Sequence, residues 1–269
     1  MLPGFGLTVG YTTFFLSAIV LIPLAAMVIK ASSLSFDQFM AVLLDPRVVA
    51  SYKLTFGTSL LAALINSVFG FAIAWALTRY DFPGRKILDA LIDMPFALPT
   101  AVSGIALTAV FAQDGWLGLQ LAKIGIQVVY TWLGITVALT LIGMPFVVRA
   151  VQPALAEVQR DLEDAAETLG AGRFVIFWRI IFPTILPALL TGFTMAFARG
   201  LGEYGSVIFI AGNLPMKTEI APLLIVIRLE EYDYDAAAAI GIAMLVLSFG
   251  LLLAINLIQI FSRRRIGLV

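Results

Sequence analysis

The sequence predicts an all-α membrane protein, built as a bundle of six transmembrane helices. Of its 269 residues, 61% are hydrophobic and only 13% are charged, whereas a soluble domain usually carries about 25% charged residues. Six intervals contain no charged side chain, and each is long enough to cross a bilayer, which takes about 20 residues of α-helix. A membrane β-barrel would show short alternating strands instead.

The six predicted spans lie at 1–29, 54–78, 94–113, 124–148, 180–198 and 236–262. The first has its apolar core from about Tyr11, and its lack of basic residues argues against a cleaved signal peptide. The fifth is expected to continue past Arg199 and Glu203 to about Ile210. We therefore divide the chain into a first helix with its outward loop (1–50), a core transmembrane unit (51–262) and a short basic cytoplasmic tail (263–269).

The distribution of lysine and arginine predicts the orientation, because loops rich in these residues stay in the cytoplasm. Alternate loops on one side hold ten of them: Arg79, Arg85, Lys86, Arg149, Arg160, Arg173, Arg179 and Arg263, Arg264 and Arg265. The other side holds six: Lys30, Arg47, Lys53, Lys123, Lys217 and Arg228. With six spans, both termini are expected in the cytoplasm, together with the loop 149–183.

Composition excludes several classes of function. Cysteine and histidine are both absent, which excludes disulfides, Cys/His metal sites, thiol nucleophiles and histidine-based triads. The formal net charge is zero, which argues against nucleic acid as a partner. No Gly-Lys dipeptide occurs, so the chain has no phosphate-binding loop of the G-x-x-x-x-G-K-[ST] type. We predict no catalytic residue, no metal site and no cofactor in this chain.

The loop 149–183 is the longest charged interval and contains a predicted amphipathic helix. Apolar residues recur from Leu155 through Val158 and Leu162 to Leu169 in steps of three and four, which is the pattern of one helical face. The opposite face is acidic, and Gly170 is expected to end the helix. A helix lying on the membrane surface is the alternative interpretation, but such helices favour lysine and arginine on their polar face.

Two places within the predicted spans are candidates for a substrate pathway. Pro99 can begin a helix whose free N–H groups, with the hydroxyls of Thr100 and Ser103, would favour an anion. Arg199 and Glu203 lie four residues apart and could pair on one face; ionisable groups at membrane depth usually face a bundle interior or water. Arg199 would then supply positive charge for an anion, and Glu203 would set its position.

Both places also have a purely structural interpretation. The first could be a proline-kinked span whose hydroxyls bond back to the helix. The second could be an ion pair that only holds two helices together, with neighbouring glycines allowing close packing. The sequence leaves both alternatives open.

A motif in the loop 149–183 resembles a known family. Asp164-Ala165-Ala166, three residues, Gly170, nine residues and Ile180-x-Phe182-Pro183 resemble the E-A-A-x3-G-x9-I-x-L-P signature of permease subunits of ATP-binding-cassette importers. Two conservative departures occur, with Asp in place of Glu and Phe in place of Leu. The resemblance implies that the segment 161–183 couples the chain, through a cytoplasmic coupling helix, to a separate ATPase, which holds ATP and Mg. The ATPase-coupling residues it implies are Glu163, Asp164, Ala165, Ala166, Gly170 and Arg173.

Longer stretches resemble the sulfate/thiosulfate importers, and most of all the first of their two permease subunits. They are Pro95-Phe-Ala-Leu-Pro-Thr-Ala-Val-Ser-Gly104, Gly143-Met-Pro-Phe-Val-Val-Arg149 and the segment 202–222. The resemblance implies a cell inner (plasma) membrane location and four kinds of partner: a related second permease, a cytoplasmic ATPase dimer, a periplasmic sulfate-binding protein and membrane lipid. The outward loop 212–235 would meet the binding protein, with Asn213, Lys217 and Glu219 as candidate contacts, or would be a solvated connection.

The resulting hypothesis is an ATP-driven importer subunit that moves sulfate or thiosulfate into the cytoplasm by alternating access. The nearest alternative is a molybdate or tungstate permease. A secondary anion transporter without an ATPase is a further alternative, although such proteins often show inverted repeats, which the sequence does not show convincingly. A membrane scaffold that transports nothing is the last alternative, and sulfate uptake would survive its deletion.

Overall fold

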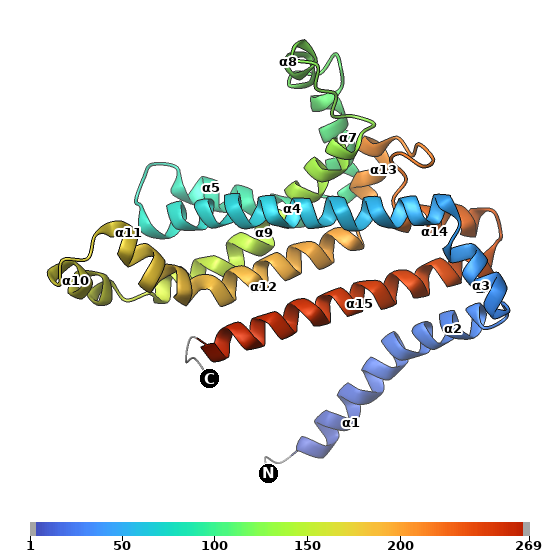
Figure 1. Cartoon of the computed structure of the whole chain (residues 1–269), viewed down its shortest axis with the longest axis horizontal. Helices are drawn as coiled ribbons and strands as arrows, with labels where there is room; N and C mark the ends of the chain where they lie inside the picture. The colour runs from blue at the N-terminus through green and yellow to red at the C-terminus, as the bar shows by residue number, and fades with distance from the viewer. Residues whose placement is uncertain (1–3, 266–269) are drawn as a thin grey trace.

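The structure is a computed structural model that describes residues 4–265, without the side chains of 160, 258 and 260–265. Every regular element in this range is a helix (Figure 1). In chain order the helices are α1 (Phe5–Leu16), the π-helical turn η1 (Ser17–Leu21), α2 (Ile22–Ala31), α3 (Phe36–Leu43), α4 (Pro46–Arg79), α5 (Arg85–Ile92), α6 (Met94–Ala97), α7 (Thr100–Phe111), α8 (Gly118–Lys123), α9 (Trp132–Glu157), α10 (Arg160–Thr168), α11 (Arg173–Ile176), the π-helical turn η2 (Phe177–Ile181), α12 (Phe182–Leu201), α13 (Gly205–Ala211), α14 (Ala221–Glu230) and α15 (Tyr234–Arg265).

Five helical stretches in the described residues are long and apolar enough to cross a membrane. They are Phe5–Ala31, Pro46–Arg79, Trp132–Glu157, Arg173–Leu201 and Tyr234–Leu257. All five overlap predicted spans, so the all-α membrane class is confirmed. Many of their large apolar side chains are exposed, for example Phe249 at 68%. Such surfaces fit lipid or another membrane subunit rather than water.

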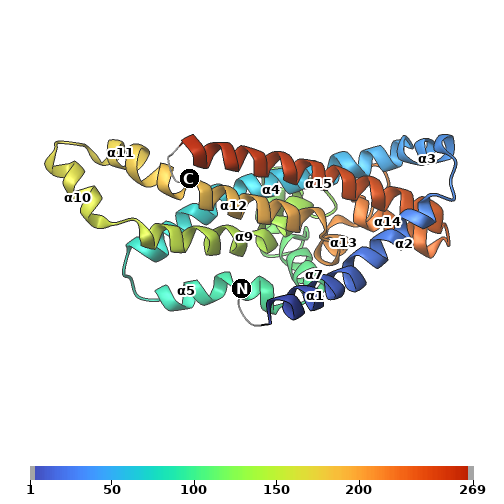
Figure 2. The same ribbon diagram turned by 90° about the horizontal axis from the view of Figure 1, so that it is seen from below.

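The helices α4, α9 and α12 pack side by side and form the core (Figures 1 and 2). Leu77 near the end of α4 and Leu155 near the end of α9 share one buried cluster, whereas Ala62 and Ile135 share a second cluster further from these ends. The helices α4 and α9 therefore run in the same direction. Figure 2 places α10 and α11 at one end of this bundle and α3 and α14 at the other.

Local sequence explains where α3 and α4 begin. Ser35 and Gln38 form a capping box, in which each side chain bonds the other residue's backbone N–H. Asp45 accepts a hydrogen bond from the backbone of Arg47, and Pro46 occupies the first helical position, where no N–H is needed. These signals fix the turn between α3 and α4, just before the longest helix.

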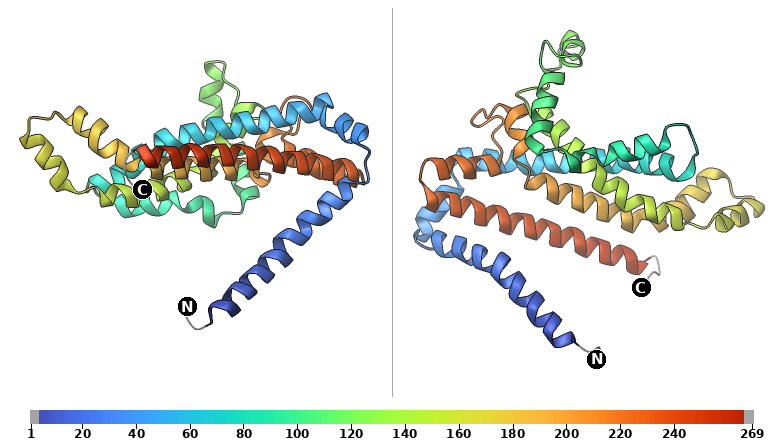
Figure 3. Two further views of the ribbon diagram at one scale, coloured as in Figure 1. Left: turned by 60° about the horizontal axis from the view of Figure 1, so that its bottom comes forward. Right: turned by 180° about the vertical axis from the view of Figure 1, so that it is seen from behind.

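The helix α1 stands apart from the bundle. None of its residues is buried, and it diverges from α15 in both views of Figure 3. An uncharged helix that buries none of its residues against the described part of the chain is available to lipid or to another subunit.

The third predicted span is not one helix, which corrects the sequence interpretation of 94–113. The helix α6 ends at Ala97, Leu98 and Pro99 are extended, and α7 begins at Thr100. Proline disfavours helical geometry at the preceding residue, which explains the break. The 12 residues of α7 reach only about 18 Å, and α7 projects away from the long helices (Figures 1 and 3).

Other boundaries also differ from the predictions. The fifth span does not continue to Ile210, because α12 ends at Leu201 and a new helix begins at Gly205. The fourth begins at Trp132 rather than 124. The cytoplasmic helix is shorter than predicted, because Val158 and Gln159 are extended and place Leu155 in α9. Residues 263–265 of the predicted basic tail continue α15, and 266–269 lie outside the described residues.

Candidate functional site

The two predicted pathway places, more than 90 residues apart in the sequence, meet in the structure. A Cβ atom added at Gly205 would lie 2.2 Å from the Thr100 hydroxyl, and one added at Gly104 would lie 2.4 Å from the Ser206 carbonyl oxygen. Only glycine permits so close an approach. The start of α7 therefore packs directly on the start of α13, as Figure 1 shows.

The predicted pairing of Arg199 with Glu203 is confirmed. The Arg199 Nη1 atom lies 2.6 Å from Glu203 Oε2, and the Glu203 side chain is only 2% exposed. The other carboxylate oxygen, Oε1, accepts hydrogen bonds from the backbone N–H and the hydroxyl of Ser206, each at 2.9 Å. Glu203 thus caps α13 and bridges the break between α12 and α13. The Arg199 side chain stays 35% exposed, so it has a face free for another group.

At the other break, the sequence predicted a helix that begins at Pro99, and α7 does begin directly after it. Pro99 immediately precedes α7, and Ser103 is buried at 3% exposure one turn into the helix. The first N–H groups of a helix have no partner within it and carry partial positive charge. An arginine and a helix start thus lie close to one paired helix break, which is an arrangement suited to an anion.

Most of the predicted coupling residues, in α10 and just after it, are exposed on the surface of the protein. Asp164, Ala165, Gly170 and Arg173 are exposed, whereas Ala166 is half-buried against the core. Gly170 has φ +84°, so the predicted helix end is confirmed. Sequence reasoning did not single out the exposure of Leu162 and Leu169, which is 54% and 88%. Two leucines beside acidic residues make a mixed surface suited to a protein partner.

The sixth coupling candidate, Glu163, is instead paired with Arg79 of α4. Its Oε1 atom lies 2.6 Å from Arg79 Nη2 at the end of α4, and the two side chains are only 24% and 12% exposed. The Arg79 guanidinium also lies 5.5 Å from the centre of the Trp75 ring, within cation–π range. The helix α10 is therefore attached to α4, the longest helix of the bundle.

Aromatic contacts attach the next part of the loop to the same helix. The Phe177 ring lies 5.8 Å from Trp75 and 6.1 Å from Phe71, both in α4. It also lies 6.0 Å from Phe182 at the start of α12. A displacement of α10 would consequently act on α4 and α12 together.

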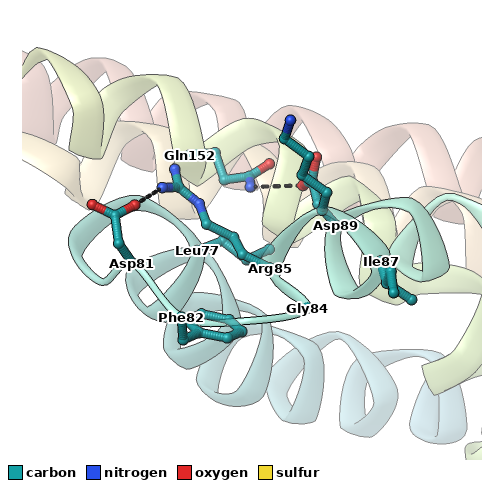
Figure 4. A pocket seen from close by; sticks show the side chains of 9 residues that line it. Leu77, Asp81, Phe82, Gly84, Arg85, Ile87, Asp89 and Gln152 are labelled. Atoms are coloured by element: carbon teal, nitrogen blue, oxygen red, sulfur yellow. Dashed lines mark hydrogen bonds and ion pairs between the residues drawn. The ribbon is translucent and has the colours of Figure 1, made fainter.

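A cavity of about 780 Å³ opens near the end of α4 to which α10 is attached (Figure 4). Its lining includes Leu77, Phe82, Arg85, Asp89 and Gln152. In Figure 4, Gln152 of α9 reaches across to Asp89 of α5 and donates a hydrogen bond of 3.1 Å. Hydrogen bonds from Gln152 and then Arg149 hold the pKa of the Asp89 carboxyl below its ordinary value. Asp89 therefore stays charged at neutral pH.

The outward candidates divide into exposed and buried residues. Lys217 is exposed and Asn213 is half-buried, with φ at 50°. Glu219 is only 2% exposed, and both of its oxygens lie 2.7 Å from the Arg47 guanidinium. This corrects the interpretation of Glu219 as a contact residue, because a buried and paired carboxylate joins the loop to α4 instead.

Comparison with known proteins identifies the family. Residues 66–267 match the model of the binding-protein-dependent transport system inner membrane component. The chain is 49% identical over 268 residues to the sulfate transport system permease protein CysT of Escherichia coli (strain K12), covering 99% of this chain and 97% of that protein. It is 47% identical over 253 residues to the protein of the same name from Synechocystis sp., covering 94% and 88%.

Solved structures share the fold. A bacterial ABC transporter involved in the import of the acidic polysaccharide alginate gives a TM-score of 0.76 at 18% identity, covering 94% of this chain and 92% of that one. The MetNI methionine ABC transporter in an inward-facing conformation gives 0.57, covering 87% and 99%. From the matched model and the near full-length relatives, the chain belongs to the family of inner membrane components of binding-protein-dependent transport systems.

Proposed function

We propose that the chain is the transmembrane permease subunit of an ATP-driven importer of sulfate or thiosulfate. One observation carries the substrate class: relatives that are 49% identical over almost their whole length are sulfate transport system permease proteins. The geometry agrees with an anionic cargo, because Arg199 and the start of α7 lie at one paired helix break. Pro99, Thr100, Ser103, Arg199 and Glu203 are the proposed pathway residues.

The proposed topology has six membrane crossings, and the third crossing is interrupted between α6 and α7. The helices α4 and α9 run in the same direction, so the chain between Arg79 and Trp132 must return along the bundle. We assign this return to α6 and α7, which cover most of the predicted third span 94–113. The 2.9 Å ion pair between Lys30 and Asp235 brings the end of α2 to the start of α15, which supports both chain ends on the side of α10. The basic loops support assigning this side to the cytoplasm.

The ATPase is proposed to be a separate subunit that docks on α10. The exposed Asp164, Ala165, Leu162 and Leu169 support this role. The attachment of α10 to α4 and α12 would turn ATPase closure into helix movement. Because a partner can shift an equilibrium only through different affinities for the two states, the ATPase must bind the inward-open and outward-open forms differently.

Exposed surfaces support the remaining proposed partners. The unburied apolar helix α1 fits a related second permease or lipid. Asn213 and the exposed Lys217 fit a periplasmic binding protein on the outward side. One related solved structure is an alginate ABC transporter in complex with its ligand-bound periplasmic protein, which supports this kind of assembly.

Uptake of labelled sulfate by the reconstituted complex tests the proposal. Vesicles should accumulate sulfate only with ATP and the binding protein present, and thiosulfate should compete. Stronger competition by molybdate or tungstate would assign the chain to the alternative anion class. Accumulation without ATP would instead identify a secondary transporter.

A further inference from the structure

Every donor of the Arg149 guanidinium is bonded. Its Nε and Nη2 atoms donate to the two carboxylate oxygens of Asp93, at 2.8 and 2.6 Å. The Nη1 atom donates to Asp89 Oδ1 and Gln152 Oε1, both at 2.7 Å, and Nη2 also donates to the Asp89 backbone carbonyl at 2.9 Å. Arginine has five N–H donors in a planar fork, so this geometry uses them all.

These bonds connect two segments that are far apart in the sequence. Asp89 and Asp93 are 60 and 56 residues before Arg149, and they belong to α5 and the turn that begins α6. Beside them, the Phe96 ring packs edge-to-face on Phe146 of α9, with centroids 5.2 Å apart. The segment α5–α6 is thus attached to α9 by one polar and one aromatic contact. We call the polar contact, made by Arg149, Asp89, Asp93 and Gln152, the Arg149 latch.

The latch lies between the two functional regions. Along α9, Arg149 is eight residues before the helix end at Glu157, beyond which α10 begins. Along the other segment, Asp93 is six residues before Pro99, which immediately precedes the start of α7 that packs on α13. A rigid contact at this point lies between α10 and the place where the start of α7 packs on the start of α13, a few residues along the chain from each.

We propose that Arg149 is a positioning residue for transport: its latch makes α5 and α6 move as one body with α9, so that a displacement at α10 reaches Pro99 and Thr100. The inference rests on the proposed function as a transporter. Lysine cannot replace the fork, because it offers three donors from a single point and no bidentate geometry.

Exposure separates this role from a role in folding. The side chains of Arg149, Asp89 and Asp93 are 34%, 43% and 47% exposed, and ion pairs that water reaches contribute little to stability. Loss of the latch should therefore leave a folded subunit in which the movement of α9 no longer carries the segment α5–α7.

The test compares Arg149→Lys and Asp93→Asn with wild type in the reconstituted complex. Both variants should lower ATP-dependent sulfate uptake at least tenfold, while ATP hydrolysis stays within twofold of wild type. Arg85→Lys is the matched control, because Arg85 lies on the same side of the bundle and pairs only with the exposed Asp81 among described residues. Its uptake should stay within twofold.

A distance measurement distinguishes coupling from general damage. The natural sequence contains no cysteine, so spin labels at two introduced cysteines, replacing Ala106 in α7 and Val68 in α4, report this one pair. The distance should change between nucleotide-free and ATP-trapped wild type, and should stay fixed in Arg149→Lys.

Normal uptake by both latch variants, or an equal loss of uptake and ATP hydrolysis, would overturn the proposal. If wild type hydrolyses ATP but imports no sulfate, the substrate assignment fails. The role of the latch is then still decided by whether the distance changes in wild type and stays fixed in Arg149→Lys.

Discussion

Breaking the ion pair between Arg79 and Glu163 should release the coupling helix from α4. The two side chains are 12% and 24% exposed. Removing one partner of a fully buried pair costs roughly 3–5 kcal/mol, whereas an exposed pair is worth about 0–1 kcal/mol. For this partly buried pair we expect a loss of about 2 kcal/mol. Since about 1.4 kcal/mol is a tenfold change in an equilibrium constant, the ratio of attached to detached α10 should fall about 30-fold.

The variant Glu163→Ala tests this magnitude. At ATPase concentrations below saturation, its sulfate uptake should fall by up to about this 30-fold factor, because the ATPase then acts on a helix that is loosely attached. The buried Arg79 Nε atom has no hydrogen-bond partner among the described residues, so losing the carboxylate leaves the guanidinium with even less compensation. Glu163→Gln keeps an acceptor and should lose less.

A double-mutant cycle identifies the pair as the cause. The double variant with Arg79→Ala should be no worse than the poorer single variant, because both changes remove one interaction. Asp81→Ala, which breaks an exposed pair on the same side, is the control and should retain uptake. Uptake of Glu163→Ala within twofold of wild type, or additive losses in the double variant, would refute the reasoning.

Further predictions concern single positions. Gly104→Ala places a Cβ 2.4 Å from a backbone oxygen and should destabilise the subunit by roughly 1–3 kcal/mol in thermal unfolding, whereas Gly202→Ala has open space and should leave the melting temperature unchanged. Glu203→Gln should abolish most uptake, because the neighbouring arginine and the start of α13 lose a shared charged partner; normal transport would contradict this. Glu219→Ala should lower the melting temperature while leaving the affinity for the binding protein unchanged, since its carboxylate is buried. Ala166→Trp should abolish uptake with normal membrane insertion, measured by fractionation and vesicle transport.

Local patterns predicted the features that depend on neighbours in sequence. The four-residue spacing of Arg199 and Glu203 gave their ion pair, and Gly170 marked the end of α10. Long uncharged intervals gave the membrane class. Each of these signals acts within one or two helical turns, where spacing alone sets geometry.

Features set by tertiary contacts could not be read in this way. The Arg149 latch joins residues that are 56 to 60 positions apart, and nothing local marks them as partners. The burial of Glu219 depends on Arg47, which is 172 residues away. The break at Pro99 did have a local signal, but uncharged composition concealed it, because hydropathy does not distinguish a continuous helix from an interrupted one.

The central claim is that this chain moves sulfate when an ATPase acts on α10. The most direct measurement is the number of sulfate ions imported per ATP hydrolysed in vesicles containing the complete complex. We predict a fixed ratio for wild type, and in Ala166→Trp import close to zero at any remaining ATP hydrolysis. Equal sulfate import by wild type and Ala166→Trp, or import without ATP hydrolysis, would contradict the account.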